Sequence, residues 1–185
     1  MREEGHKVSD TWGVAEAVRL RPIEESDLPE VLRLIWDPEA PGEYQWFGFR
    51  VDVARDLERR WHEDGLIGSE KSFMVVESDN ACAGWMSWKV LPTGNVEIGI
   101  ALFPEFRGRG IGTAAQRQMV QYLFDTTPVH RIQAGTEIDN IAEQRSLERV
   151  GFQREGVVRG AAFRAGRWRD GVMYSLLRDD LRPPT

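Results

Sequence analysis

The chain has 185 residues, enough apolar side chains for a core (41% hydrophobic) and a formal net charge of −6. This length suits one globular domain, and the negative charge argues against nucleic acid or an anionic membrane as the main partner. No apolar run approaches the roughly 20 residues of a membrane-spanning helix. We expect residues 1–15, which are polar, to form a flexible lead-in and residues 16–185 to form the single domain. The one cysteine, Cys82, cannot form an internal disulfide and fits the reducing cytoplasm.

The predicted domain begins with one strand and two helices. Residues 18–23 alternate apolar and basic side chains, which is typical of a half-exposed strand. Ser26 is the expected N-cap of the first helix, and Pro38 ends that helix. After a loop at residues 38–48, apolar side chains spaced four apart predict a second helix over residues 51–63.

Short apolar runs separated by turn residues then predict three strands. They cover residues 72–77, 81–90 and 96–103. A helix is expected over residues 113–124, and alternating apolar side chains predict a further strand over residues 131–138. A strand–helix–strand crossover places its two strands parallel or nearly neighbouring in one sheet.

The last part of the chain predicts one short helix and a closing hairpin. Asn140 is the expected N-cap of the helix, and Gly151 follows its end. Two strands, at residues 152–163 and 168–177, are joined by a four-residue turn. The complete order predicts an α/β (α+β) fold in which about four helices flank a mixed, mostly antiparallel sheet of about seven strands.

Residues 107–113 read Arg-Gly-Arg-Gly-Ile-Gly-Thr and lie between a predicted strand and a predicted helix. Glycines let the backbone approach a bulky anion, and the start of a helix offers unpaired N–H groups and a positive dipole end. Arg107 and Arg109 would add positive charge. The segment therefore predicts a phosphate cradle, with an ordinary strand-to-helix turn as the alternative.

The spacing of this loop excludes two common nucleotide sites. Counted from Gly108 and Gly110, the third glycine of a dinucleotide fingerprint would stand where the chain has Thr113, and its acidic partner would fall near His130. The lysine of a nucleoside-triphosphate loop is absent as well. Neither a Rossmann domain nor a Walker-type enzyme is expected.

The pattern Arg107-x-x-Gly110-x-Gly112 resembles the loop with which GNAT acetyltransferases hold the pyrophosphate of acetyl-coenzyme A (acetyl-CoA). The predicted order of elements is also that of the GNAT fold. Residues 140–152 and 164–177 look like signatures of the branch that contains the ribosomal-protein N-terminal acetyltransferases. The resemblance implies that the fourth and fifth strands splay apart and that the chain acetylates an amine.

The resemblance implies a cofactor site around the splayed strands and the glycine loop. Backbone N–H groups of the fourth strand would orient the thioester, and Asn140 would contact the pantetheine arm, although a helix N-cap without a ligand is the alternative. The implied acetyl-CoA contacts are Ala101, Leu102, Arg107, Gly108, Arg109, Gly110, Ile111, Gly112, Thr113 and Asn140.

Two glutamates are the catalytic candidates. Glu97 stands on the fourth strand where many family members carry a glutamate that deprotonates the amine, often through water, but alternation could also place it on an exposed face. Glu143 stands where the branch usually has a serine, and Leu147 where other branches have a tyrosine. Glu143 could serve as the acid, but Asn140-x-x-Glu143 is also a capping box, which we favour.

Aromatic residues mark the expected acceptor pocket. The candidates are Tyr44, Trp46, Phe47, Trp85 and Trp88, which suit a bulky acceptor or a cation, or else cover an open sheet face. The resemblance implies that the acceptor is a small-molecule amine or a protein N-terminus and that the chain is a monomer or homodimer. The histidines show no metal spacing, so no metal is expected. The alternative to an enzyme is a non-catalytic module that binds acyl-CoA.

Overall fold

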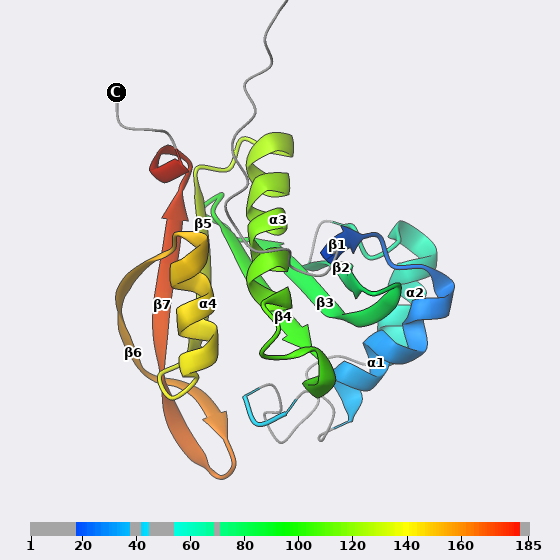
Figure 1. Cartoon of the computed structure of the whole chain (residues 1–185), viewed down its shortest axis with the longest axis horizontal. Helices are drawn as coiled ribbons and strands as arrows, with labels where there is room; N and C mark the ends of the chain where they lie inside the picture. The colour runs from blue at the N-terminus through cyan, green and yellow to red at the C-terminus, as the bar shows by residue number, and fades with distance from the viewer. Residues whose placement is uncertain (1–17, 38–41, 45–53, 69–70, 182–185) are drawn as a thin grey trace, which may run out of the picture.

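The computed structural model describes residues 18–37, 42–44, 54–68 and 71–181, and seven strands of this part form one sheet (Figure 1). The strands are β1 (Val18–Arg21), β2 (Lys71–Ser78), β3 (Ala81–Val90), β4 (Val96–Leu102), β5 (Arg131–Glu137), β6 (Gln153–Arg164) and β7 (Arg167–Leu177). Their order is β1-β2-β3-β4-β5-β7-β6. Within the described residues β4 and β5 form the one parallel pair, so the predicted mixed, mostly antiparallel sheet is confirmed. The lead-in at residues 1–15 lies outside the described residues.

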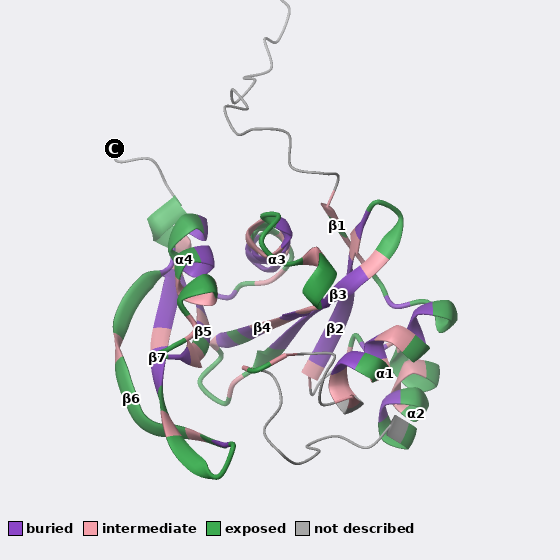
Figure 2. Ribbon diagram, turned by 60° about the horizontal axis from the view of Figure 1, so that its bottom comes forward, coloured by how far each residue is buried: buried purple, intermediate pink, exposed green. Residues whose placement is uncertain are grey.

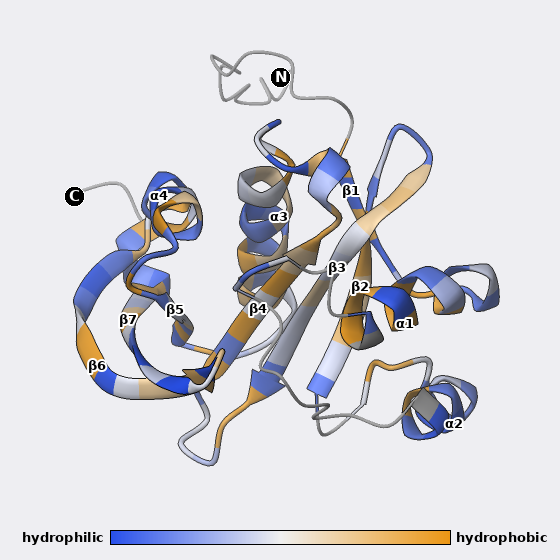
Figure 3. Cartoon of the chain, turned by 90° about the horizontal axis from the view of Figure 1, so that it is seen from below, coloured by the Kyte–Doolittle hydropathy of each residue, from blue (hydrophilic) through white to orange (hydrophobic). Residues whose placement is uncertain are grey.

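Helices cover both faces of the sheet (Figure 2). The four α-helices of the described part are α1 (Leu28–Trp36), α2 (Ala54–Asp64), α3 (Ile111–Thr126) and α4 (Ile141–Val150). One apolar core joins α3 and α4 to the sheet, and a second joins α1 and α2 to the opposite face. The outer surface of α2 is hydrophilic (Figure 3). The predicted helix over residues 51–63 corresponds to α2, and residues 51–53 lie outside the described part.

The ends of α4 follow the sequence prediction. Asn140 Oδ1 accepts a hydrogen bond from Glu143 N at 3.3 Å, as an N-cap does. Gly151 ends the helix with a φ of 114°, and its N–H bonds to carbonyl groups of the last turn. The expected N-cap of the first helix, Ser26, is wrong, because a 3₁₀ turn precedes α1 and Asp27 takes the cap position.

The final two strands form a long, strongly curved hairpin (Figure 3). The register between β6 and β7 shifts twice, at residues 154–156 and 158–162, and such bulges bend a strand. The hairpin therefore forms a curved wall beside β5. None of the described helices is long and apolar enough to cross a lipid bilayer.

Candidate active site

The turn between β4 and α3 leaves Gly112 and Thr113, in the first turn of α3, on the wall of a cavity. Gly110 directly precedes α3 and has a φ of 80°, a left-handed conformation that favours glycine. The position that a Cβ of Gly110 would take has no heavy atom within 4 Å. Gly108, Gly110, Gly112 and Thr113 line a cavity of about 500 Å³, here called the cradle pocket. Since helix N-termini bind phosphate groups, this geometry supports the predicted pyrophosphate site.

The two arginines of the loop have different environments. Arg107 lines the cradle pocket, and its Nε and Nη2 donate to the carbonyl oxygen of Leu102 at 2.9 and 2.6 Å. Arg109 instead donates to Asp79 Oδ2 at 2.9 Å and is not among the residues of the cradle pocket. Of the two arginines, Arg107 therefore lies where it could supply positive charge to a phosphate, whereas Arg109 ties the loop to the turn between β2 and β3.

Sequence reasoning missed two further cations of the cradle pocket. Arg145 and Arg149 lie one turn apart on α4 and line this cavity. Their spacing of four residues on a helix was the signal that could have revealed them. Ala101 and Ile111 were predicted contacts, but their side chains are buried, with 2% and 1% exposed. Their backbone atoms are what they can offer to a cofactor.

Strands β4 and β5 separate after a short parallel pairing. The pairing involves Val96 with Ile132 and Glu97 with Gln133, and beyond these residues the strands diverge. A cavity of about 570 Å³ opens there, here called the gap pocket. It is lined by Trp85 and Ser87, near the α1–α2 core, and by Gln116 of α3. Because residues of both faces line it, the gap pocket passes through the sheet, as the predicted splay requires.

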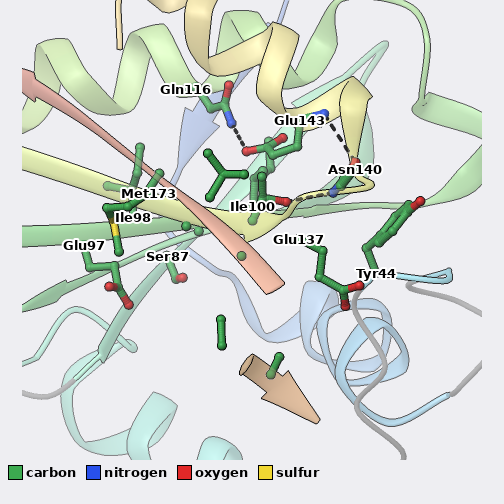
Figure 4. Close-up of a pocket in the computed structure, with 18 of the residues that line it drawn as sticks. Tyr44, Ser87, Glu97, Ile98, Ile100, Gln116, Glu137, Asn140, Glu143 and Met173 are labelled. Carbon is green, nitrogen blue, oxygen red and sulfur yellow. Dashed lines mark hydrogen bonds between the residues drawn. The ribbon is translucent and has the colours of Figure 1, made fainter. Parts of the chain in front are cut away.

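The gap pocket and the cradle pocket meet at four shared residues. Tyr44, Ile100, Asn140 and Glu143 line both cavities, and we call this place the pocket junction (Figure 4). A molecule in the gap pocket and a cofactor in the cradle pocket would come into contact at this point. The pocket junction is therefore the place where a group can pass from one to the other.

Glu97 lies on the wall of the gap pocket, away from Tyr44 (Figure 4). The residue is exposed, and its Oε2 accepts a hydrogen bond from Gln133 Nε2 at 3.1 Å. The structure has Glu97 on the exposed face, which was the alternative to the role of base, but this face lies on the wall of the gap pocket. Glu97 can thus meet a ligand of the gap pocket directly or through water.

The predicted aromatic wall is only partly formed by the described residues. Trp85 lines the gap pocket, but Trp88 packs against Tyr122 of α3 with ring centroids 5.8 Å apart. The prediction for Trp88 is wrong, because residues three apart on a strand point to opposite faces. Trp46 and Phe47 lie outside the described residues.

An ion pair and an aromatic ring border the gap pocket opposite Glu97. Arg164 Nε and Nη2 donate to the two carboxylate oxygens of Glu137 at 2.5 and 2.8 Å. Tyr44 stacks on Arg164, with 5.2 Å from the guanidinium carbon to the ring centroid, and its hydroxyl donates to Asp139 O at 3.2 Å. The hydrogen bonds that Arg164 donates to Glu137 raise the pKa of Arg164, which stays charged. The ion pair was not predicted from the sequence.

Glu143 does not form the capping box that the sequence favoured. Its backbone N–H bonds to Asn140, but its carboxylate Oε1 accepts a hydrogen bond of 2.5 Å from Gln116 Nε2 on α3. Asn140 Nδ2 donates to Thr136 Oγ1 at 3.0 Å. Burial raises the pKa of Glu143 from 4.5 to about 7, and the bond from Gln116 partly opposes this rise. Glu143 can therefore hold or release a proton near neutral pH.

The described residues include no group of three or more His, Cys, Asp and Glu side chains that could hold a metal ion. His62 lies on α2, and His130 directly precedes β5. His6 lies outside the described part of the chain.

The open helix start, the splayed strands and the pocket junction are the features expected of an acyltransferase that binds a coenzyme A thioester. The model of the protein family described as "Acetyltransferase (GNAT) domain" matches residues 17–153 of this chain. The chain therefore belongs to the GNAT acetyltransferase family, and the predicted fold and family are confirmed. It is an N-acetyltransferase that transfers an acetyl group from acetyl-CoA to an amine.

Individual relatives agree with this assignment. The chain is 34% identical over 176 residues to "Probable N-acetyltransferase YjcK" of Bacillus subtilis (strain 168), covering 89% of this chain and 96% of that one. It is 28% identical to "Putative ribosomal N-acetyltransferase YdaF" of the same organism, covering 91% and 95%. A spermidine N-acetyltransferase from Vibrio cholerae, solved with CoA and spermine, has the same fold, with a TM-score of 0.76, 22% identity and coverage of 88% and 96%. The name of YdaF agrees with the predicted branch.

Proposed function

We propose that the acceptor is a primary amine of a small molecule, which enters through the gap pocket. The observation that carries this proposal is the cavity of about 570 Å³ between Glu97 and the pocket junction. Sites for small molecules typically enclose roughly 300–1,000 Å³. Small residues contribute to its lining, namely Ser87, Gly99, Gly135 and Gly171.

Glu97 is the proposed general base. An amine arrives protonated, and Glu97 accepts a proton from it directly or through water, as its exposed position allows. The neutral nitrogen then attacks the thioester carbon at the pocket junction, the C–S bond breaks, and the thiol leaves with a proton. Backbone N–H groups of Ala101 and Leu102, beyond the last pairing of β4 with β5, are proposed to orient the thioester.

The N-terminus of a protein is the second candidate acceptor. The name of YdaF, a putative ribosomal N-acetyltransferase, favours it, whereas spermine in the Vibrio cholerae structure favours the small amine. An α-amino group is also a primary amine and would use the same carboxylate, Glu97. The two classes differ in how much of the acceptor must fit inside the gap pocket.

A competition experiment separates the two classes. The full chain is incubated with acetyl-CoA and one mixture of small amines and peptides with free N-termini, and the products are identified by mass spectrometry. Acetylated small amines would support the proposal. Acetylated peptides with unmodified small amines would replace it by the second candidate.

We also place the enzyme in the cytoplasm, as a monomer or homodimer. A chain with the single cysteine Cys82 needs no oxidising compartment for folding. Fractionation of the producing cells tests the location, and analytical ultracentrifugation tests the oligomeric state.

A further inference from the structure

A chain of hydrogen bonds links the cradle pocket to Glu143. Thr113 Oγ1, in the first turn of α3, lies 2.8 Å from Ser146 Oγ of α4. Ser146 Oγ lies 2.6 Å from Gln116 Oε1, and Gln116 Nε2 lies 2.5 Å from Glu143 Oε1. The chain thus runs from a residue of the phosphate cradle to a residue of the pocket junction.

All the bonds of this chain point the same way. The amide oxygen of Gln116 only accepts, so Ser146 donates its single hydroxyl proton to it. Thr113 must then donate to Ser146, and the amide nitrogen of Gln116 donates to Glu143. Hydrogen bonds that are all oriented in one direction strengthen one another. The bond from Gln116 Nε2 to Glu143 Oε1 is therefore stronger than the same bond would be alone.

Gln116 is held firmly, and Glu143 keeps one oxygen for other partners. Gln116 is only 1% exposed, and both ends of its amide are engaged. The second oxygen of Glu143, Oε2, accepts no hydrogen bond from any side chain or backbone group that the structure describes. Glu143 lines both cavities, so this oxygen is available to a ligand at the pocket junction (Figure 4).

We propose that Gln116 is a positioning residue, which holds Glu143 at the pocket junction so that its carboxyl group protonates the departing thiolate. The inference rests on the proposed function. In the step, the C–S bond of the tetrahedral intermediate breaks, its electron pair remains on sulfur, and the proton of Glu143 moves to that sulfur. The proton that Glu97 took from the ammonium group passes to solvent, the nitrogen then loses its remaining excess proton to Glu97 or water, and Glu143 regains a proton from solvent. Overall, the acetyl group moves from sulfur to nitrogen, and of the two protons that the protonated amine loses, one ends on the thiol and one in solvent.

The protonation of Glu143 suits this role. Burial raises its pKa to about 7, so a large fraction carries a proton at neutral pH. Other charged or titratable residues also line the two cavities, namely Glu43, Tyr44, Lys71, Glu97, Arg107, Glu137, Arg145 and Arg149. Burial raises the pKa of Glu143 and the hydrogen bond from Gln116 lowers it, so a change at Gln116 should alter the titration of Glu143.

The first test measures kcat against pH for the unmodified enzyme, Glu143→Gln and Gln116→Met. In the unmodified enzyme kcat should fall above about pH 7, as Glu143 loses its proton. Glu143→Gln should remove this fall and lower the plateau about tenfold or more. Gln116→Met should move the fall to higher pH, because the lost hydrogen bond opposed the raised pKa, and should lower kcat with the KM for acetyl-CoA within about twofold.

Gln118→Met is the matched control. It removes an amide from the same helix, but Gln118 bonds to Val18 O at 2.7 Å and to Leu20 N at 3.1 Å and is not among the residues that line the two cavities. It should leave the pH profile unchanged. A Gln116→Met enzyme with the pH profile of the unmodified enzyme, or a Glu143→Gln enzyme with unchanged kcat, would overturn the proposal.

A second measurement needs no turnover. A carboxyl group whose pKa is raised on folding contributes stability below its unfolded pKa of 4.5, which is lost as pH rises through about 7. Urea unfolding of the unmodified chain should thus show a loss of stability between pH 5 and 8 that Glu143→Gln lacks. If this difference is present and no amine is acetylated, the proposed function fails and the arrangement of Glu143 stands. If the difference is absent, the inference fails.

Discussion

Arg164 and Glu137 form an ion pair in which both partners are more than nine-tenths buried, with 6% and 8% of their side chains exposed. Two parallel hydrogen bonds join the guanidinium to the carboxylate. Glu137 ends β5 and Arg164 ends β6, so the pair fixes the tip of the curved hairpin to the wall of the gap pocket. Burying both charges costs desolvation free energy, but removing only one partner is strongly destabilising because the other charge stays buried alone.

We therefore predict that Arg164→Met destabilises the fold by about 3–5 kcal/mol, because it leaves the Glu137 carboxylate buried without its partner. The double variant Arg164→Met with Glu137→Met should be more stable than Arg164→Met alone, since no buried charge remains. Urea unfolding of both variants measures this difference. Equal stability of the single variant and the unmodified chain would show that the pair is not essential for the fold.

The cradle makes a prediction about Gly110. Gly110→Ala should weaken acetyl-CoA binding at least tenfold, because the Cβ would stand where the backbone approaches the pyrophosphate. Gly94→Ala is a close control: Gly94 has a φ of 81°, no atom lies within 4 Å of its Cβ position, and it lies in the turn between β3 and β4. Both changes impose a similar backbone strain of about 1–2 kcal/mol. Calorimetric titration should show a weaker affinity in Gly110→Ala alone.

The gap pocket makes a prediction about Gly135, which lines it from β5. Gly135→Val should raise the KM for the amine about tenfold and leave the KM for acetyl-CoA unchanged, because the new side chain takes acceptor space. Gly156→Val, on β6 outside both cavities, is the control. Steady-state kinetics with each substrate varied gives the answer. A change in the KM for acetyl-CoA alone would place the acceptor elsewhere.

Glu97 should be the residue whose neutralisation lowers the rate most. Glu97→Gln removes the proton acceptor while keeping a side chain of the same size, and kcat should fall about a hundredfold. Glu58→Gln, an exposed change on α2, should have no effect. Stopped assays at pH 7 and 9 measure kcat for both variants. An unchanged kcat in Glu97→Gln would mean that water or another group takes the proton.

Local patterns predicted the fold and the cradle. The glycine loop, the cap at Asn140 and the helix end at Gly151 are each encoded within a few neighbouring residues, and the structure has them where the sequence placed them. The face of the sheet on which Trp88 lies could have been predicted too, because Trp85 and Trp88 are three residues apart on one strand and so point to opposite faces.

Pairs between distant residues could not be predicted from one sequence. Gln116 and Glu143 are 27 residues apart, as are Glu137 and Arg164, and only the packing of the elements brings them together. The capping box for Glu143 was a sound local prediction, since its backbone bond to Asn140 forms. Its side chain turned to Gln116 because α3 and α4 lie side by side (Figure 1).

The most direct test of the account is the rate at which the full chain releases free thiol from acetyl-CoA with a pool of small amines, compared with the same assay on Gly135→Val. The account predicts release that depends on the amine, matched by an equal amount of acetylated product, and slower in the variant at low amine concentration. No release by the unmodified chain, with acetyl-CoA bound in a separate titration, would contradict it and favour a module that binds acyl-CoA without catalysis.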